Sequence, residues 1–169
     1  LVLPVILIQQ WLEVTKKIFP DRYIYVHHGL RKKELAKEIL HRKPFIVITS
    51  HGLIYKRTGD RVFVPSVLHD ISWERVIVDE AHYMKNISSL KTQGIMSLDA
   101  NSKWALTGTP IQNKIEDVNT LFRFVGFSPD YIESNFSEIQ NKVEKLDEDL
   151  DESAVEDKYS TKNKDNKNE

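Results

Sequence analysis

The stretch Val76-Ile77-Val78-Asp79-Glu80-Ala81-His82 joins an apolar run to two adjacent carboxylates and a histidine. Its three β-branched residues are typical of a buried parallel strand, and open α/β sheets bind ligands at the carboxyl ends of such strands. Adjacent carboxylates that are partly buried need a positive partner, and a hydrated Mg²⁺ on a nucleotide phosphate is one solution. Taken alone, the Asp-Glu pair is more often a solvated turn, so its meaning depends on the rest of the chain.

On both sides of this stretch, apolar strand-like runs alternate with amphipathic helix-like segments. We expect a strand at residues 1–9 that Pro4 could interrupt, further strands at 23–27, 45–49, 76–78 and 103–106, and helices at 10–18, 31–40, 88–98 and 116–125. Residues 55–70 are expected to be irregular, with a turn at Gly59-Asp60 and an extended run at 62–64. This alternation predicts βαβ units, and therefore an α/β fold with a parallel sheet covered by helices on both faces.

The spacing of apolar residues predicts which sides of the helices are buried. In the helix at 10–18 we expect Trp11, Val14 and Ile18 to share one face. The helix at 116–125 is expected to pack on the sheet through a set of residues at three- and four-residue spacings, namely Ile115, Val118, Leu121, Phe122 and Val125. The three tryptophans, Trp11, Trp73 and Trp104, lie in apolar patterns and are expected in the core rather than as platforms for stacked bases.

Composition places the chain among ordinary globular domains. Its 169 residues are 40% apolar and 29% charged with a net charge of −1, which by itself indicates neither a nucleic-acid nor a membrane partner. Residues 141–169 hold 6 Lys and 10 Asp or Glu, which leaves 18 of the 24 basic and 15 of the 25 acidic residues in the first 140 positions. Cysteine is absent, which excludes disulfides and thiolate metal sites, and without a His-Glu-x-x-His pattern the pair His27-His28 does not indicate zinc.

The two ends of the chain differ from its middle. The apolar run at residues 1–8 is too short for a signal peptide or a membrane span, so we expect neither secretion nor a membrane partner. A chain that opens on a strand-like run, with Leu1 in place of Met, is expected to be a piece cut inside a domain. We expect one partial domain at 1–139 and an acidic, polar tail at 140–169, helical over 138–150 and disordered over 153–169.

Small polar residues follow three of the expected strands. They are Thr49-Ser50-His51-Gly52, Asp79-Glu80-Ala81-His82 and Thr107-Gly108-Thr109-Pro110. Because the carboxyl ends of parallel strands share one edge of a sheet, these groups could meet in one crevice. Glycine and small hydroxyl residues let a backbone approach phosphates or a nucleic-acid strand closely.

Four stretches resemble the first RecA-like lobe of the Swi/Snf-type ATPases, the DNA translocases and chromatin remodellers of helicase superfamily two. VIVDEAHYMKN at 76–86 is similar to the Walker B (DEAH) motif, and LTGTPIQN at 106–113 to the motif that follows it. FIVITSHGLI at 45–54 resembles the DNA-contacting motif before Walker B, and LVLPVILIQQW at 1–11 resembles the strand and turn after the Walker A segment. The resemblance covers about residues 1–139, and the run at 70–75 resembles the DNA-repair branch of the family.

The resemblance implies a RecA-like, P-loop NTPase type of fold, truncated at its N-terminal edge, together with ATP and Mg²⁺ as cofactors. It assigns Asp79 to holding Mg²⁺ through water and Glu80 to orienting the attacking water as general base. Residues that couple this site to a second RecA-like lobe would be His82, Thr107, Gly108, Thr109, Gln112 and Asn113. Residues that face double-stranded DNA, free or in nucleosomes, would be Gln9, Gln10, Thr49, Ser50, Gly52, Lys85 and Asn86.

The chain lacks one part that such an ATPase needs. None of its six glycines is followed by Lys, so the printed sequence contains no Gly-Lys-Thr phosphate loop. We therefore expect the chain alone to bind ATP poorly and to hydrolyse it negligibly, as part of a larger nuclear, viral or otherwise intracellular DNA-dependent ATPase. The alternative is a non-catalytic remnant that serves as a DNA- or protein-binding module. A Gly-Lys-Thr encoded just upstream and an arginine-bearing lobe downstream would favour the ATPase.

Overall fold

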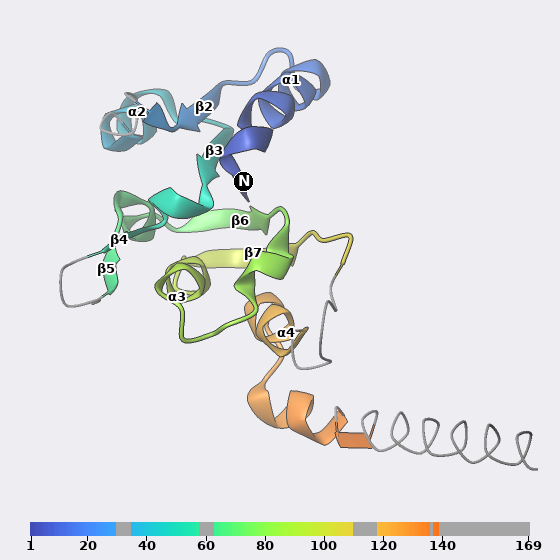
Figure 1. The fold of residues 1–169 in the computed structure, drawn as a ribbon. Helices are drawn as coiled ribbons and strands as arrows, with labels where there is room; N and C mark the ends of the chain where they lie inside the picture. The colour runs from blue at the N-terminus through green and yellow to red at the C-terminus, as the bar shows by residue number, and fades with distance from the viewer. Residues whose placement is uncertain (30–34, 58–62, 110–117, 136, 139–169) are drawn as a thin grey trace, which may run out of the picture. The chain divides into compact units, whose positions relative to one another are not determined.

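We analysed the protein as a computed structural model that describes residues 1–29, 35–57, 63–109, 118–135 and 137–138 (Figure 1). The chain divides into two compact units, Leu1–Phe127 and Ser128–Glu169. In the second unit, residues 129–135 are helical. The predicted helix over 138–150 and the predicted disorder over 153–169 lie outside the described residues, apart from Glu138.

Five parallel strands form the main sheet of the first unit, in the order β2-β3-β1-β6-β7 (Figure 1). Their bounds are β1 (Val2–Leu3), β2 (Ile24–His27), β3 (Ile46–Ser50), β6 (Trp73–Val78) and β7 (Ala100–Ala105). The chain runs from β1 to β2 and β3 on one side, then crosses back past β1 to β6 and β7 on the other. This reversal puts the switch point of the sheet between β1 and β6, which is where open α/β sheets bind ligands.

Helices cover both faces of the sheet because neighbouring strand residues point to opposite sides. Val2 and Val78 belong to the larger core cluster, together with residues of α2 (Leu35–Arg42), α3 (Leu90–Met96) and α4 (Asn119–Val125). Leu3 and Ile48 belong to a second cluster, against which Trp11 and other residues of α1 (Ile8–Ile18) pack. The predicted α/β class, with a parallel sheet between helices, is confirmed.

The first strand is shorter than the predicted strand at residues 1–9. β1 ends at Leu3, and Pro4 follows it. Because Pro4 has no N–H to donate to a neighbouring strand, the chain turns instead into the short 3₁₀ helix η1 (Val5–Leu7), in which Leu7 N donates to Pro4 O over 3.0 Å. α1 then begins at Ile8, two residues earlier than predicted.

Two helices bury only part of the side that their spacing predicted. In α1, Val14 and Ile18 are exposed, while Thr15 is buried and its hydroxyl donates to Trp11 O over 2.7 Å. At α4, Val118 and Leu121 are buried as predicted, but Phe122 and Val125 are exposed, and Thr120 and Phe124 are buried instead. Ile115 lies outside the described residues. The apolar residues satisfy the helical period in more than one rotation, so spacing alone did not determine which rotation faces the sheet.

The tryptophans also differ from one another. Trp73 packs against the core, and its indole N–H donates to Leu68 O over 2.9 Å, as expected of a partly buried indole. Trp104, on the edge strand β7, is 49% exposed, so its predicted core position is wrong. The guanidinium carbon of Arg75 lies 4.6 Å from the centre of the Trp104 ring, so the indole is partly covered by a cation instead.

Between β3 and β6 the chain is more regular than predicted. β4 (Tyr55–Arg57) pairs antiparallel with β5 (Phe63–Pro65), and the predicted turn at Gly59-Asp60 lies outside the described residues. A 3₁₀ helix, η4 (Val67–Asp70), follows, and Ser66 caps it.

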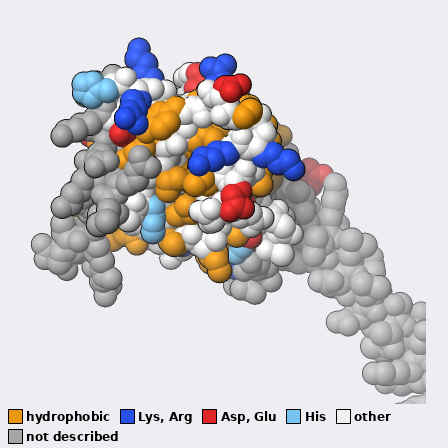
Figure 2. All heavy atoms as spheres, turned by 90° about the horizontal axis from the view of Figure 1, so that it is seen from above, with side chains coloured by type: hydrophobic (Ala, Val, Ile, Leu, Met, Phe, Trp, Pro, Cys, Tyr) orange, Lys and Arg blue, Asp and Glu red, His pale blue; other side chains and the backbone are white. Residues whose placement is uncertain are grey.

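Seen from above, the described surface of the chain intersperses Lys and Arg side chains with hydrophobic and acidic ones (Figure 2). In the described ranges, no helix is both long and apolar enough to span a bilayer.

Candidate functional site

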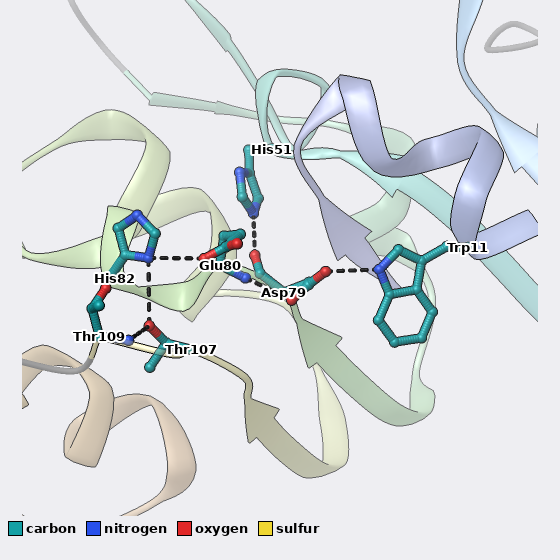
Figure 3. Close-up of polar contacts among 7 residues, drawn as sticks. All are labelled: Trp11, His51, Asp79, Glu80, His82, Thr107 and Thr109. Atoms are coloured by element: carbon teal, nitrogen blue, oxygen red, sulfur yellow. Dashed lines mark hydrogen bonds and ion pairs between the residues drawn. The ribbon is translucent and has the colours of Figure 1, made fainter. Parts of the chain in front are cut away.

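Asp79 stands at the carboxyl end of β6 and is held by hydrogen bonds from several elements (Figure 3). Its backbone N–H donates to Val2 O over 2.8 Å, which ties it to β1 at the switch point. Its two carboxylate oxygens accept from Trp11 Nε1 at 2.7 Å and from Glu80 N at 2.9 Å. The Asp79 carbonyl oxygen lies 3.1 Å from His51 Nε2 and accepts its hydrogen, since a carbonyl can only accept.

Glu80 adopts a left-handed backbone conformation, with φ 51° and ψ 45°. This conformation costs an L residue about 1 kcal/mol and recurs at functional turns. It turns the Glu80 carboxylate toward His82, whose Nδ1 lies 3.1 Å from Glu80 Oε2. An ionised carboxylate only accepts hydrogen bonds, so His82 Nδ1 carries the hydrogen in this contact. The Glu80 side chain is 40% exposed and therefore open to a ligand.

The loop after β7 lies beside this turn. Ala81 N donates to Leu106 O, and Leu106 N donates to Val78 O, each over 2.8 Å, so the ends of β6 and β7 are joined. As a result, Thr107 Oγ1 lies 3.4 Å from His82 Nδ1 (Figure 3). Thr109 N donates to the same hydroxyl over 3.2 Å, while Gly108 is exposed. The structure thus brings together the three predicted strand ends; Gln112 and Asn113 lie outside the described residues.

His51 occupies a buried position in η3 (His51–Leu53), directly after β3. Burial is the main cause that lowers the pKa of His51 to about 4; the positive charge of Lys91 acts in the same direction, and the hydrogen bond to Asp79 opposes them. His51 is therefore neutral at pH 7. A neutral imidazole keeps its Nε2 hydrogen available for the Asp79 carbonyl without adding a charge to the site.

We expect the depressed pKa of His51 to make the fold acid-sensitive. In the unfolded chain, His51 takes up a proton near pH 6.5, whereas in the folded chain it does so only near pH 4, so the unfolded state binds more protons between these values. The contribution of His51 to the free energy of unfolding is therefore fully present above about pH 6.5. It is lost as the pH drops toward 4, which lowers the free energy of unfolding by on the order of 2 kcal/mol.

Urea denaturation at pH 7 and pH 4.5 checks this expectation. His51→Gln keeps an N–H donor but does not titrate, so the variant should lose less stability between the two pH values than the unsubstituted chain. Comparing the two chains cancels the contribution of every other titrating group. Equal losses in both would show that His51 is not the acid-sensitive residue.

The residues predicted to face DNA are placed on several elements. Gln9 and Gln10 are exposed on the first turn of α1, where Gln9 Nε2 donates to Glu13 Oε1 over 2.8 Å. Thr49 and Ser50 are buried in β3, and the Thr49 hydroxyl donates to His27 O over 3.2 Å. The prediction for this segment therefore depends on its backbone and on the exposed Gly52. The two remaining positions are the partly exposed Lys85 and the exposed Asn86.

Asp79 is compatible with the predicted role of holding Mg²⁺ through water. A carboxylate has about four lone-pair positions, and Trp11 and Glu80 use one on each oxygen, which leaves positions for metal-bound water. The described residues include no group of three or more His, Cys, Asp or Glu that could hold a metal ion. Mg²⁺ commonly relies on one or two carboxylates together with substrate phosphates, and Asp79 supplies one such carboxylate.

Two aromatic residues of this region were not recognised in the sequence. Trp11 was expected only in the core, yet its indole bonds Asp79 across 68 positions of sequence, a separation at which no local pattern can reveal a contact. Tyr83 lies near two histidines, with ring centroids 6.0 Å from His51 and 4.4 Å from His82. The only feature of the sequence that could have indicated Tyr83 was its position two residues after the Asp-Glu-Ala triplet.

A comparison with known protein families matches residues 1–158 to the SNF2-related domain. The chain belongs to this family. Among similar SNF2-related proteins, the DNA repair protein RAD5 of Gibberella zeae is 34% identical over 142 residues, which covers 76% of the chain and 12% of RAD5. Transcription termination factor 2 of Drosophila melanogaster is 35% identical over 130 residues, which covers 76% of the chain and 12% of that protein. The chain thus spans a small part of the length of these relatives.

The fold of this SNF2-related chain is also similar to a solved structure, the Sulfolobus solfataricus SWI2/SNF2 ATPase core in complex with double-stranded DNA. The TM-score is 0.59 and the identity 26%, over 74% of this chain and 24% of the other. The sheet order and this similarity together confirm the predicted RecA-like architecture. The roles of individual site residues stay predictions.

Proposed function

We propose that this chain supplies the carboxylate turn, the DNA-facing segments and the coupling loop of a DNA-dependent, helicase-like ATPase. The complete ATPase would use ATP and Mg²⁺ and would convert hydrolysis into movement along double-stranded DNA, free or in nucleosomes. A second RecA-like lobe would complete its site. A nuclear location follows from this role and forms part of the proposal.

One observation carries the proposal: the Asp79-Glu80 turn at the switch point is connected through His82 to Thr107. An acid pair alone would fit many metal sites. Here Glu80 lies 3.1 Å from His82 Nδ1, and the same nitrogen lies 3.4 Å from the first residue of the loop after β7. If Glu80 responds to a second lobe, it needs such a connection, because a movement of the loop after β7 can then reorient the Glu80 carboxylate through His82.

In this proposal the two acids have different tasks. Asp79, with one hydrogen bond on each oxygen, would hold Mg²⁺ through water, and the ion would supply positive charge against the nucleotide phosphates. Glu80, whose side chain is 40% exposed and held by His82, accepts a proton from the attacking water and orients it. His82 and Thr107 set the direction of the Glu80 carboxylate. Main-chain N–H groups of the DNA-facing segments contact phosphates. Such contacts hold a DNA strand without reading its base sequence.

DNA binding by the chain is the first test. We expect labelled duplexes of unrelated sequence to bind with similar affinity, and the affinity to fall steeply between about 50 and 200 mM salt. Lys85→Ala should reduce the salt slope by about 1, because one phosphate contact is lost. Lys16→Ala, which removes an exposed cation from the last turn of α1, serves as the matched control and should leave the slope unchanged. If Lys16→Ala lowered the salt slope as much as Lys85→Ala does, Lys85 would not be a specific DNA contact.

A second candidate is a module that binds DNA or another protein without catalysis. The printed sequence holds no Gly-Lys pair, which is compatible with both candidates, and a Gly-Lys-Thr encoded upstream would favour the ATPase. We expect negligible phosphate release by the 169-residue chain, with or without DNA, under either candidate. Restoring activity by joining the chain to a Gly-Lys-Thr loop and a second lobe would support the ATPase, whereas continued inactivity of a folded, DNA-binding fusion would support the module.

A further inference from the structure

Asp79 receives side-chain hydrogen bonds from two elements that are distant in sequence. Trp11, on α1, donates to Asp79 Oδ2 over 2.7 Å, and His51, on η3, donates to the Asp79 carbonyl over 3.1 Å (Figure 3). One contact holds the carboxylate and the other holds the backbone of the same residue. A movement of either α1 or η3 would therefore change the position of Asp79.

Both elements carry residues that the sequence predicts to face DNA. Gln9 and Gln10 lie in the first turn of α1 and are exposed, while Trp11, the next residue, points inward. On η3, the exposed Gly52 directly follows the buried His51. Each of these two DNA-facing segments is thus a single peptide bond away from a residue that bonds Asp79.

Packing makes these connections stiff. The Trp11 ring packs against the cluster of Leu3, Ile24 and Ile48, so the indole cannot turn away without opening that cluster. His51 is 8% exposed, and its ring meets that of Tyr83 edge-on. A donor whose rotamer is fixed by packing transmits a shift of its backbone to its acceptor.

We propose that Trp11 and His51 are positioning residues that transmit DNA binding to Asp79. DNA seated on the first turn of α1 and on η3 shifts both donors and so changes how Asp79 presents its oxygens to a divalent cation. This inference rests on the proposed function, because it needs duplex DNA to bind these two segments. It assigns to Trp11 a hydrogen-bonding task in addition to its place in the core.

The first arm of the test uses Mn²⁺ alone as the probe and needs no DNA. Mn²⁺ bound near Asp79 broadens the NMR amide signals of residues 79–82, and a titration yields its affinity. Trp11→Phe keeps most of the ring but removes the N–H, and we expect about tenfold weaker Mn²⁺ binding. Trp73→Phe removes an indole hydrogen bond of similar length to Leu68 O, away from Asp79, and should leave the affinity within about twofold.

The second arm adds duplex DNA without metal. At saturation, the indole N–H signal of Trp11 and the amide signal of Glu80 should shift, while the indole signal of Trp73 stays in place. In Trp11→Phe and in His51→Leu, the Glu80 shift should fall to less than about half, because one connection is removed. His51→Gln, which keeps a donor, should restore most of it.

The outcomes separate the two proposals. If the unsubstituted chain fails to bind DNA, the proposed function fails and the transmission fails with it. If DNA binds but the Glu80 signal does not move, or moves equally in Trp11→Phe, only the transmission is overturned. Equal loss of Mn²⁺ affinity in Trp73→Phe and Trp11→Phe would likewise overturn it, since general loosening of the fold would then explain both.

Discussion

Glu80→Gln should lower DNA-stimulated ATP hydrolysis by on the order of 10² to 10⁴-fold in a protein that joins this chain to a Gly-Lys-Thr loop and a second RecA-like lobe. The amide has the size of the carboxylate but cannot accept a proton from water. Affinities for nucleotide and for DNA should stay within about twofold, because the substitution acts on the transition state. Steady-state phosphate release, with separate binding titrations, measures the three quantities.

Glu74→Gln is the matched control for this substitution. Glu74 lies on the same strand, is exposed, and accepts a hydrogen bond from Asn101 Nδ2 over 2.9 Å. It is far along β6 from the turn, so hydrolysis should be unchanged. A Glu80→Gln protein that retained full turnover would show that another group activates the water, and the role given to Glu80 would be wrong.

Ile48→Ala should destabilise the fold by about 2 to 5 kcal/mol, the usual cost of such a truncation in a core. Ile48 is fully buried in β3, between β2 and β1, and shares its cluster with Leu3 and Ile24. α1 packs on this cluster through Trp11, so the cavity would also loosen the helix that holds Asp79. Urea denaturation followed by circular dichroism measures the free energy of unfolding.

Ile6→Ala provides the comparison, because Ile6 is 86% exposed in η1. The same truncation there should change the free energy of unfolding by less than about 0.5 kcal/mol. Similar losses in the two variants would mean that the α1 face of the sheet is not a packed core. A large loss in Ile48→Ala alone would support the packing that anchors Trp11.

Local patterns in the sequence were sufficient for the class of fold and for the acid turn. β-branched runs formed the strands β2, β3 and β6, and the alternation with helices produced the parallel sheet. Where the apolar pattern allowed two local solutions, it did not decide between them. The apolar run at residues 1–9 allowed either a long strand or one interrupted at Pro4, and the strand ends before Pro4; the periodicity of α1 likewise fits two rotations of the helix.

The spacing of residues along the chain established that a strand ends in Asp79 and Glu80, and that other strands end in small polar residues. These are short-range properties, since strand propensity and acid spacing act over a few residues. The partners of Asp79 were established only by folding. Trp11 and His51 lie 68 and 28 positions away, and they reach Asp79 because β1 lies between β3 and β6 in the sheet. Strand order depends on how the whole chain buries its apolar surface, so no local window of sequence contains it.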